Sequence, residues 1–442
     1  MPADFSTLSE NPHILIVGGG FAGLECAKGL AAADANITLF DRHNYHLFQP
    51  LLYQVATAVL SPADIAAPIR RILRKQQNVR VVMETLLGVE LETKVAHFPS
   101  GDVCYDYLVL ASGVTHSYFG HDDWAPLAPG LKTVDDALEI RRRVLSAYET
   151  AEWEADAASR KAELTFIVVG GGPTGVELAG ALKEIASQTI PKDFRNIDTT
   201  TAEIILVEAA DRLLGALPKK LADRALGDLQ EMGVVVRLNS LVTDIQSGGI
   251  TIGEEFLAAK NIIWAAGVRG SDVTESLGVE LDHQGRVVVT DNLSIAGFPE
   301  VYVIGDLAHV VDSDSQQQVP GVAQAAIQMG QYVARDICRK PGQEINDKPF
   351  VYRDRGSMAT IGRNHAVATI GGKHFSGFFA WLIWGVIHIF PLITFRRKVS
   401  VLLSWFWSYF SLSKDVRLIT GKSKVKINRS PATVGKSGKW KS

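Results

Sequence analysis

The segment ILIVGGGFAGLECAKGL, residues 14–30, decides the fold of this chain. An apolar run rich in β-branched residues leads into a cluster of glycines, and a helical pattern of apolar residues follows. The segment therefore predicts a strand, a tight turn and a helix. A second segment, FIVVGGGPTGVELAGAL at residues 166–182, aligns with the first without gaps. The repeat predicts two mononucleotide-binding units of an α/β fold, which could hold two different dinucleotides.

The first glycine turn has the spacing Gly18-x-Gly20-x-x-Gly23. Gly18 permits the tight turn, Gly20 lets the backbone approach a pyrophosphate, and Gly23 lets the helix pack on the strand. Asp41 follows the next apolar run, where a carboxylate can accept hydrogen bonds from an adenosine ribose. A glycine-rich turn that binds nothing is the alternative, but the order strand, turn, helix, strand and Asp favours a dinucleotide site.

The second turn repeats this spacing as Gly170-x-Gly172-x-x-Gly175, with Glu208 as its acidic residue. Glu208 comes later than the usual distance of about 20 residues, because residues 190–202 have the character of an insertion. A carboxylate here binds both ribose hydroxyls and repels a 2′-phosphate, which favours NADH over NADPH. Arg212 lies nearby in sequence and weakens that preference.

Composition excludes several other classes of protein. The 442 residues allow two or three domains, and 45 Lys plus Arg against 48 Asp plus Glu argue against a nucleic-acid-binding protein. The three cysteines, Cys26, Cys104 and Cys338, contain no closely spaced pair, so they predict no disulfide framework or iron–sulfur site. The histidines form no ligand pattern with carboxylates or thiols, and we predict no metal.

The C-terminal region differs from the rest of the chain. No charged residue lies between Lys373 and Arg396, and the final 32 residues carry nine Lys plus Arg against one Asp. Between them an amphipathic helix is predicted, with apolar and serine faces. The apolar face comprises Val399, Leu402, Leu403, Phe406 and Phe410, and the other comprises Ser400, Ser404, Ser408 and Ser411. Apolar segments followed by a basic tail predict attachment to membrane lipid. Residues 374–395 are also long enough for the alternative, one transmembrane helix.

Longer motifs carry a resemblance to a known family. Both glycine turns, together with ASG at 111–113, AAG at 265–267 and IGD at 304–306, resemble the flavoproteins with two dinucleotide-binding domains. Further segments resemble type II NADH dehydrogenase, the single-subunit NADH:quinone oxidoreductase. They are HLFQPLLYQVATAVLSP at 46–62, YFGH at 118–121, GLKTVDDALEIRRRVLSAYETAE at 130–152, VPGVAQAAIQMG at 319–330 and RGSMATIGR at 355–363.

The resemblance implies an FAD domain interrupted by an inserted NADH domain, both Rossmann-like. We expect these units at 11–120 and 271–340 for FAD, 163–270 for NADH, 346–412 for membrane-anchoring helices, and 413–442 for a basic tail. It further implies electron transfer from NADH through FAD to a quinone, either ubiquinone or menaquinone, without proton pumping. Membrane attachment is expected to be monotopic, and a homodimer is a further expectation. The polar N-terminus resembles neither a secretory signal nor a transit peptide, so we expect the cytoplasmic face.

The resemblance also implies roles for individual residues. Asp306 is expected to bond the flavin ribityl chain, and a helix from Pro320 to about Cys338 should aim its N-terminus at the flavin ring. Four further positions are expected to bind cofactor, and two glutamines on one helix face belong to the motif associated with the quinone site. The cofactor positions are Gly113, Gly267, Gly305 and Ala323, and the glutamines are Gln324 and Gln328.

Glu177 resembles a family glutamate at the junction of nicotinamide and flavin, where it could handle the proton of the quinone. Glu25 holds the equivalent place in the first repeat, so a helix-start carboxylate without chemistry remains an alternative.

Other functions remain open from the sequence. A sulfide:quinone oxidoreductase shares the flavin and the membrane, but it needs reactive cysteines near the flavin, and these three do not group. A disulfide reductase is excluded, because it needs a closely spaced cysteine pair and the chain has none. A membrane-bound flavoprotein that senses redox state with little turnover is the second alternative.

Overall fold

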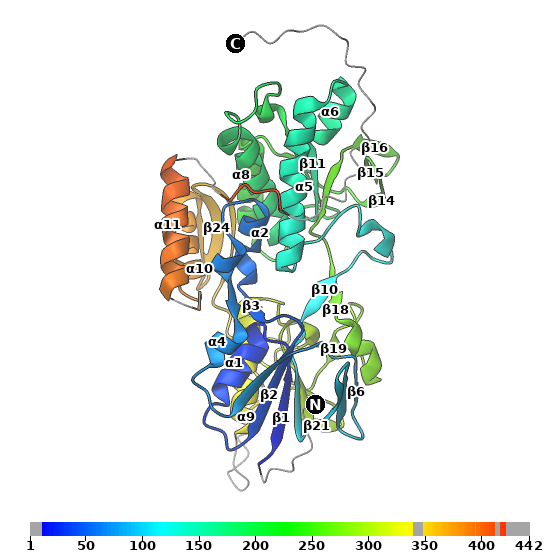
Figure 1. Ribbon diagram of the computed structural model, residues 1–442, viewed down its shortest axis with the longest axis vertical. Coiled ribbons are helices and arrows are strands. Elements are labelled where there is room, and N and C mark those ends of the chain that lie inside the picture. The colour runs from blue at the N-terminus through cyan, green and yellow to red at the C-terminus, as the bar shows by residue number, and fades with distance from the viewer. Residues whose placement is uncertain (1–10, 339–347, 394, 412–415, 421–442) are drawn as a thin grey trace, which may run out of the picture.

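The computed structural model describes residues 11–338, 348–393, 395–411 and 416–420. Its two main parallel sheets lie toward opposite ends of the long axis (Figure 1). The first sheet has six strands in the order β20-β21-β9-β1-β2-β5, of which only β20 is antiparallel to its neighbour. Their bounds are β20 Ser294–Ile295, β21 Phe298–Val303, β9 Tyr107–Leu110, β1 His13–Val17, β2 Asn36–Asp41 and β5 Val79–Met83.

The second sheet repeats the centre of the first. Its order is β13-β12-β11-β17, with bounds β13 Val235–Arg237, β12 Glu203–Val207, β11 Thr165–Val169 and β17 Asn261–Trp264. Val17 pairs with Phe40 in the first sheet, and Val169 pairs with Val207 in the second. The helix after the glycine turn is α1 Phe21–Gly29 in one copy and α7 Pro173–Glu184 in the other. The predicted α/β repeat is therefore confirmed as two Rossmann-like units.

Short strands, antiparallel except for the pair β19 Val287–Val288 and β22 Ala308–His309, connect these units and extend from them. β10 Val114–His116 pairs with β18 Val268–Gly270 where the chain passes between the two main sheets (Figure 1). The remaining small strands are β3 Tyr45–Leu47, β4 Ala66–Pro68, β6 Gly88–Glu90, β7 Val95–Phe98, β8 Gly101–Cys104, β14 Val242–Gln246, β15 Gly249–Ile252 and β16 Glu255–Ala258. The other helices before the C-terminal region are α2 Leu52–Ala56, α3 Pro62–Ile65, α4 Ile69–Leu73, α5 Val134–Trp153, α6 Ala157–Glu163, α8 Lys219–Glu231 and α9 Ala323–Ile337.

Two large apolar cores hold the molecule together. One surrounds the first sheet, where α1 packs against α9. The other surrounds α7 and α5, and it also includes Leu51, Leu52 and Val55 from the segment around α2. This segment belongs by sequence to the first unit but packs on the second, so it connects the two.

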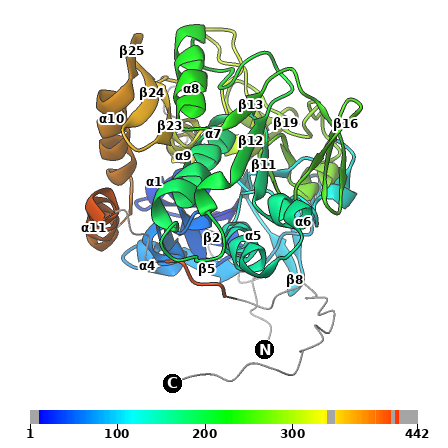
Figure 2. The same cartoon turned by 90° about the horizontal axis from the view of Figure 1, so that it is seen from above.

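The C-terminal region forms a three-stranded antiparallel sheet and two helices. The strands are β23 Ser357–Gly362, β24 His365–Ile370 and β25 Lys373–Ser376, and the helices are α10 Gly377–Ile389 and α11 Phe395–Ser411. Figure 2 shows α10 and α11 on one side of the molecule, opposite β16. β23 packs closely on α7, since a Cβ at Gly180 would collide with the carbonyl of Ile361.

The predicted amphipathic helix exists as α11. Ser400, Ser404 and Ser408 of its serine face are half-buried, whereas Ser411 is exposed. Ser400 donates to Asp64 Oδ1 at 2.7 Å, and Val401 is fully buried. The outer surfaces of α10, the turn after it and α11 carry exposed large apolar residues, which we call the apolar face. They are Phe378, Phe379, Leu382, Val386, Ile387, Phe390, Phe395, Leu402, Leu403, Phe406, Trp407 and Phe410.

One alternative and one expectation for the second half of the chain need correction. Residues 374–395 are divided between β25, α10 and the start of α11, and within the described ranges no helix is both long and apolar enough to cross a membrane. The helix expected from Pro320 begins at Ala323, because Val322 is extended and serves as the N-cap. Most of the expected basic tail lies outside the described residues.

Candidate functional site

The first glycine turn has the backbone that a pyrophosphate requires. Gly18 has φ of +108°, and a Cβ there would collide with the carbonyl of Ala111. A Cβ at Gly23 would collide with the carbonyl of Gly18, which explains the close contact of strand and helix. Around Gly20 no other atom lies within 4 Å of a Cβ position. The turn therefore leaves open space beside the N-terminus of α1, where phosphate oxygens would meet unpaired amides.

Asp41 is held in place at the end of β2. Its Oδ2 accepts from the amide of Gly19 at 2.6 Å, and its Oδ1 accepts from the amide of His43 at 2.6 Å. Each carboxylate oxygen keeps a further lone pair. The arrangement fixes an acceptor for ribose hydroxyls next to the phosphate turn.

The second turn reproduces this geometry. Gly170 has φ of +112°, a Cβ at Gly175 would collide with the carbonyl of Gly170, and the space around Gly172 is open. Glu208 Oε2 accepts from the amide of Gly171 at 2.5 Å, and its Oε1 accepts from the amide of Ala210 at 2.7 Å. The side chains and backbone present thus fit two dinucleotides.

Arg212 does not approach the carboxylate of Glu208 as a partner. Its Nη2 donates to the carbonyl of Gly215 at 2.9 Å. The negative charge of Glu208 at the ribose position is therefore not neutralised by Arg212.

The other expected flavin residues gather at the C-terminal edge of the first sheet. Gly113 and Gly305 both have positive φ, +70° and +73°. Gly305 directly precedes Asp306, which is half-buried. Lys132 lies close enough for Asp306 to act on it: burial lowers the pKa of Lys132, and the negative charge of Asp306 opposes that effect. Lys132 was not singled out from the sequence. Gly267, with φ of +72°, lies instead beside the second sheet, against Phe119.

Gln324 and Gln328 share one face of α9, as their spacing predicts, and both hold the same backbone segment. Gln324 donates to the carbonyl of Gly356 at 2.9 Å and accepts from the amide of Arg355 at 3.1 Å. Gln328 donates to the carbonyl of Arg353 at 3.0 Å and accepts from the same residue's amide at 3.0 Å. This segment leads into β23.

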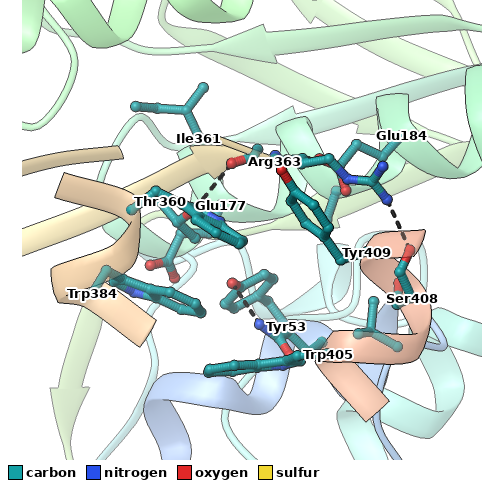
Figure 3. Close-up of a pocket in the computed structure, with 15 residues that line it drawn as sticks. Tyr53, Glu177, Glu184, Thr360, Ile361, Arg363, Trp384, Trp405, Ser408 and Tyr409 are labelled. Atoms are coloured by element: carbon teal, nitrogen blue, oxygen red, sulfur yellow. Dashed lines mark hydrogen bonds between the residues drawn. The ribbon is translucent and has the colours of Figure 1, made fainter. Parts of the chain in front are cut away.

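A pocket of about 100 Å³, partly open to solvent, lies between α2, α7, β23 and the two C-terminal helices (Figure 3). Aromatic and polar side chains line it, and neither Gln324 nor Gln328 is among them. The lining residues are Tyr53, Gln54, Val59, Glu177, Ala181, Glu184, Thr360, Ile361, Gly362, Arg363, Trp381, Trp384, Trp405, Ser408 and Tyr409.

Glu177 differs from Glu25, its equivalent in the first repeat, because β23 and the C-terminal helices pack around it. Burial in the pocket raises the pKa of Glu177 to about 8, and a backbone contact with Thr360 opposes this shift. Glu25 instead pairs with Lys28 at 2.7 Å on the surface. At neutral pH Glu177 is therefore mainly a carboxylic acid, which can donate a proton.

Sequence reasoning missed several residues of this pocket. Tyr53 and Gln54 lie within the matching motif at 46–62 without a predicted role of their own, Trp384 lies in the apolar segment at 374–395, and Trp405 had no predicted role. The indole Nε1 of Trp384 is buried without a hydrogen-bond partner among the described residues.

Within the described residues no group of three His, Cys, Asp or Glu could hold a metal ion. Cys26 is buried, whereas Cys104 and Cys338 are exposed, and all three are free.

Comparisons with known proteins agree along most of the chain. Residues 12–330 match the pyridine nucleotide-disulphide oxidoreductase family, and residues 355–411 match the NDH2 C-terminal domain. The type II NADH:quinone oxidoreductase Ndh of Mycobacterium tuberculosis is 45% identical over 425 residues, covering 92% of this chain and 90% of that protein. NdhA of the same organism is 42% identical, covering 94% and 91%.

Solved structures share the fold at low identity. NDH2 from Plasmodium falciparum in complex with NADH has a TM-score of 0.85 at 19% identity, covering 93% of this chain and all of that chain. The sulfide:quinone oxidoreductase of Aquifex aeolicus has a TM-score of 0.69 at 18% identity, covering 90% and 95%.

Proposed function

This chain belongs to the type II NADH:quinone oxidoreductases, and from that premise we propose how its residues divide the reaction among three sites. The enzyme is a single-subunit flavoprotein that transfers electrons from NADH to quinone. The observation that carries the division is the duplicated turn, in which each copy combines an open glycine with a carboxylate held by two amides.

The second turn binds NADH. Glu208 faces the ribose position with its carboxylate fixed by two backbone amides, so its lone pairs are directed before the nucleotide arrives. A 2′-phosphate would meet that fixed negative charge, which disfavours NADPH. Gly170, Gly172 and Gly175 give the pyrophosphate its access to α7.

The first turn and the edge of its sheet bind FAD, which accepts hydride from NADH and passes electrons on when it is bound. Gly18, Gly20 and Gly23 form the phosphate turn, and Asp41 accepts from the ribose. Asp306 takes the ribityl chain. The N-terminus of α9 at Ala323 adds a partial positive charge beside the ring. Gly113 and Gly305 are assigned to the same site, and Gly267 to the nucleotide side.

The pocket at Glu177 receives the quinone ring. Its walls are aromatic, its floor carries a carboxylic acid, and its outer helices bear the apolar face. Gln324 and Gln328 act on this site indirectly, because they hold the segment that leads into β23 and its pocket residue Thr360. Ubiquinone and menaquinone both fit this description.

The enzyme is membrane-associated, and the apolar face is the surface proposed to enter the lipid. Each large side chain removed from water there contributes about 1.5–3 kcal/mol. The cytoplasmic side and the homodimer stay predictions.

No observation favours the alternatives over this assignment. A sulfide:quinone oxidoreductase needs reactive cysteines near the flavin, and among the described residues Cys26 is buried in α1, Cys104 ends β8 and Cys338 follows α9. A sensor with little turnover differs from this proposal only in its rate.

The test measures NADH oxidation with and without a short-chain quinone, on the FAD-loaded enzyme. Quinone should strongly accelerate NADH oxidation. If it does not, the alternative of a redox sensor with little turnover is favoured. Val59→Trp, which narrows the pocket, should raise the KM for quinone and leave anaerobic flavin reduction by NADH unchanged. An unchanged KM for quinone would move its site elsewhere.

A further inference from the structure

A chain of hydrogen bonds runs from the outer helix α11 into the pocket. The indole Nε1 of Trp405 donates to Gln54 Oε1 at 2.7 Å. The Nε2 of Gln54 in turn donates to the hydroxyl oxygen of Tyr53 at 3.0 Å. An indole N–H can only donate, so Trp405 fixes which end of the Gln54 amide faces Tyr53.

This fixed amide decides where the proton of Tyr53 can go. Because the Tyr53 oxygen accepts from Gln54, its own O–H must point away from Gln54. Figure 3 shows the Tyr53 ring and the Glu177 side chain directed into the same space, between Trp384 and Trp405. Burial raises the pKa of Tyr53 well above its usual range, so the hydroxyl carries a proton.

Other polar groups of the pocket are already engaged. The hydroxyl of Tyr409 donates to Asn364 Oδ1 at 3.3 Å. The hydroxyl of Thr360 donates to the carbonyl of His365 at 3.3 Å. Trp384, only 3% exposed, keeps an indole N–H without a partner among the described residues. A buried, unsatisfied donor is costly, and a ligand carbonyl oxygen would satisfy it.

We propose that Tyr53 is the proton donor to the quinone oxygen, that Gln54 and Trp405 are positioning residues that direct its hydroxyl, and that Glu177 replaces its proton. This inference rests on the proposed function, which makes the pocket the quinone site. It assigns to α11 a role in the reaction in addition to its apolar outer face.

The step balances as follows. The Tyr53 O–H bond breaks while an O–H bond forms on the quinone, and Tyr53 takes the proton of the Glu177 carboxyl group. Glu177 then regains a proton from water at the mouth of the pocket. FAD, when bound and reduced, would supply the two electrons and the second proton that turn quinone into quinol.

The experiment compares Tyr53→Phe with wild type in the FAD-loaded enzyme, using two acceptors. Reduction of a short-chain quinone should slow by about 100-fold, the size of effect that loss of a general acid produces. Ferricyanide takes electrons without protons, so its reduction should be unchanged, as should anaerobic flavin reduction by NADH. Quinone binding to the oxidised enzyme, followed by quenching of tryptophan fluorescence, should also be unchanged.

Two variants complete the design. Trp405→Phe should lower kcat for quinone, raise its solvent isotope effect and leave its KM unchanged, because the Gln54 amide is then free to turn. Tyr148→Phe is the matched control. The Tyr148 hydroxyl is buried outside this pocket without a partner among the described residues, and its loss should leave the reduction rates of both quinone and ferricyanide unchanged.

The outcomes separate the two proposals. Equal slowing with quinone and ferricyanide would mean that Tyr53 supports the flavin, and the inference fails. Wild-type quinone rates in Tyr53→Phe would also overturn it. In that case a raised KM in Val59→Trp would keep the pocket as the quinone site, and an unchanged one would reject the site as well.

Discussion

Replacing Glu177 with Gln should stabilise the enzyme, and only above about pH 5. Burial raises the pKa of this carboxyl from 4.5 to about 8. Between these values the folded protein keeps a proton that the unfolded chain has released. The free energy of unfolding of wild type then falls by about 1.4 kcal/mol per pH unit, or about 5 kcal/mol over the whole interval. Glu177 is only half-buried by its accessible surface, so solvent screens the effect and we expect about 2–3 kcal/mol.

The assay is urea unfolding of the FAD-loaded proteins in detergent from pH 5 to pH 9, with unfolding midpoints compared at constant slope. The difference in unfolding midpoint between Glu177→Gln and wild type should appear above pH 5, grow with pH and become constant near pH 9. Glu25→Gln, at the equivalent position of the first repeat, should show no such gap, because that carboxylate pairs with Lys28 at the surface. A gap that is the same at pH 5 and pH 9 would refute the reasoning, since it could not come from the proton.

Three further predictions address the other sites. Glu208→Ser should reduce the preference for NADH over NADPH by about tenfold, or about 1.4 kcal/mol. The ratio of kcat/KM for the two nucleotides measures this preference, and an unchanged ratio would remove Glu208 from the site. Gln324→Ala should cost about 1–2 kcal/mol of stability and slow quinone reduction but not flavin reduction by NADH. Stopped-flow traces measure both half-reactions, and equal slowing of the two would contradict this prediction. Leu403→Glu with Phe406→Glu should move the enzyme from pelleted vesicles to the supernatant with NADH reactivity intact; retention on the vesicles would place the lipid contact elsewhere.

The sequence predicted the two dinucleotide units well because their signals are local. A strand, a glycine turn and a helix are adjacent in the chain, and each acidic residue ends the strand that pairs next to them. Asp41 and Glu208 therefore reached their positions beside the turns as expected. Their roles toward the nucleotides stay predictions that the substitutions above would test.

The pocket could not be predicted, because its walls come from five elements far apart in the chain. Glu25 and Glu177 have nearly identical local surroundings in sequence, and only the packing of β23 and the C-terminal helices distinguishes them. The same limit applies to Gln324: its helix face followed from spacing, but its partner, residues 353–356, did not.

Aromatic residues near the C-terminus posed a different problem. Their composition predicts contact with lipid, yet Trp384 is buried in the same core as Val401 and Leu392. Removing the chain from Phe375 onward would therefore open this core as well as remove the apolar face, and point substitutions on the outer surface are the cleaner perturbation.

The helix pair α10 and α11 joins two parts of the proposed function. One side of the pair lines the pocket proposed for quinone, and the other carries the apolar face proposed to enter the lipid. Together the two proposals predict that quinone reaches its site from the lipid. The rate should then follow the mole fraction of quinone in the lipid and not its amount per volume of buffer. Adding empty vesicles that fuse with the loaded ones should slow turnover at constant total quinone, and lengthening the isoprenoid tail should lower the apparent KM through partitioning alone.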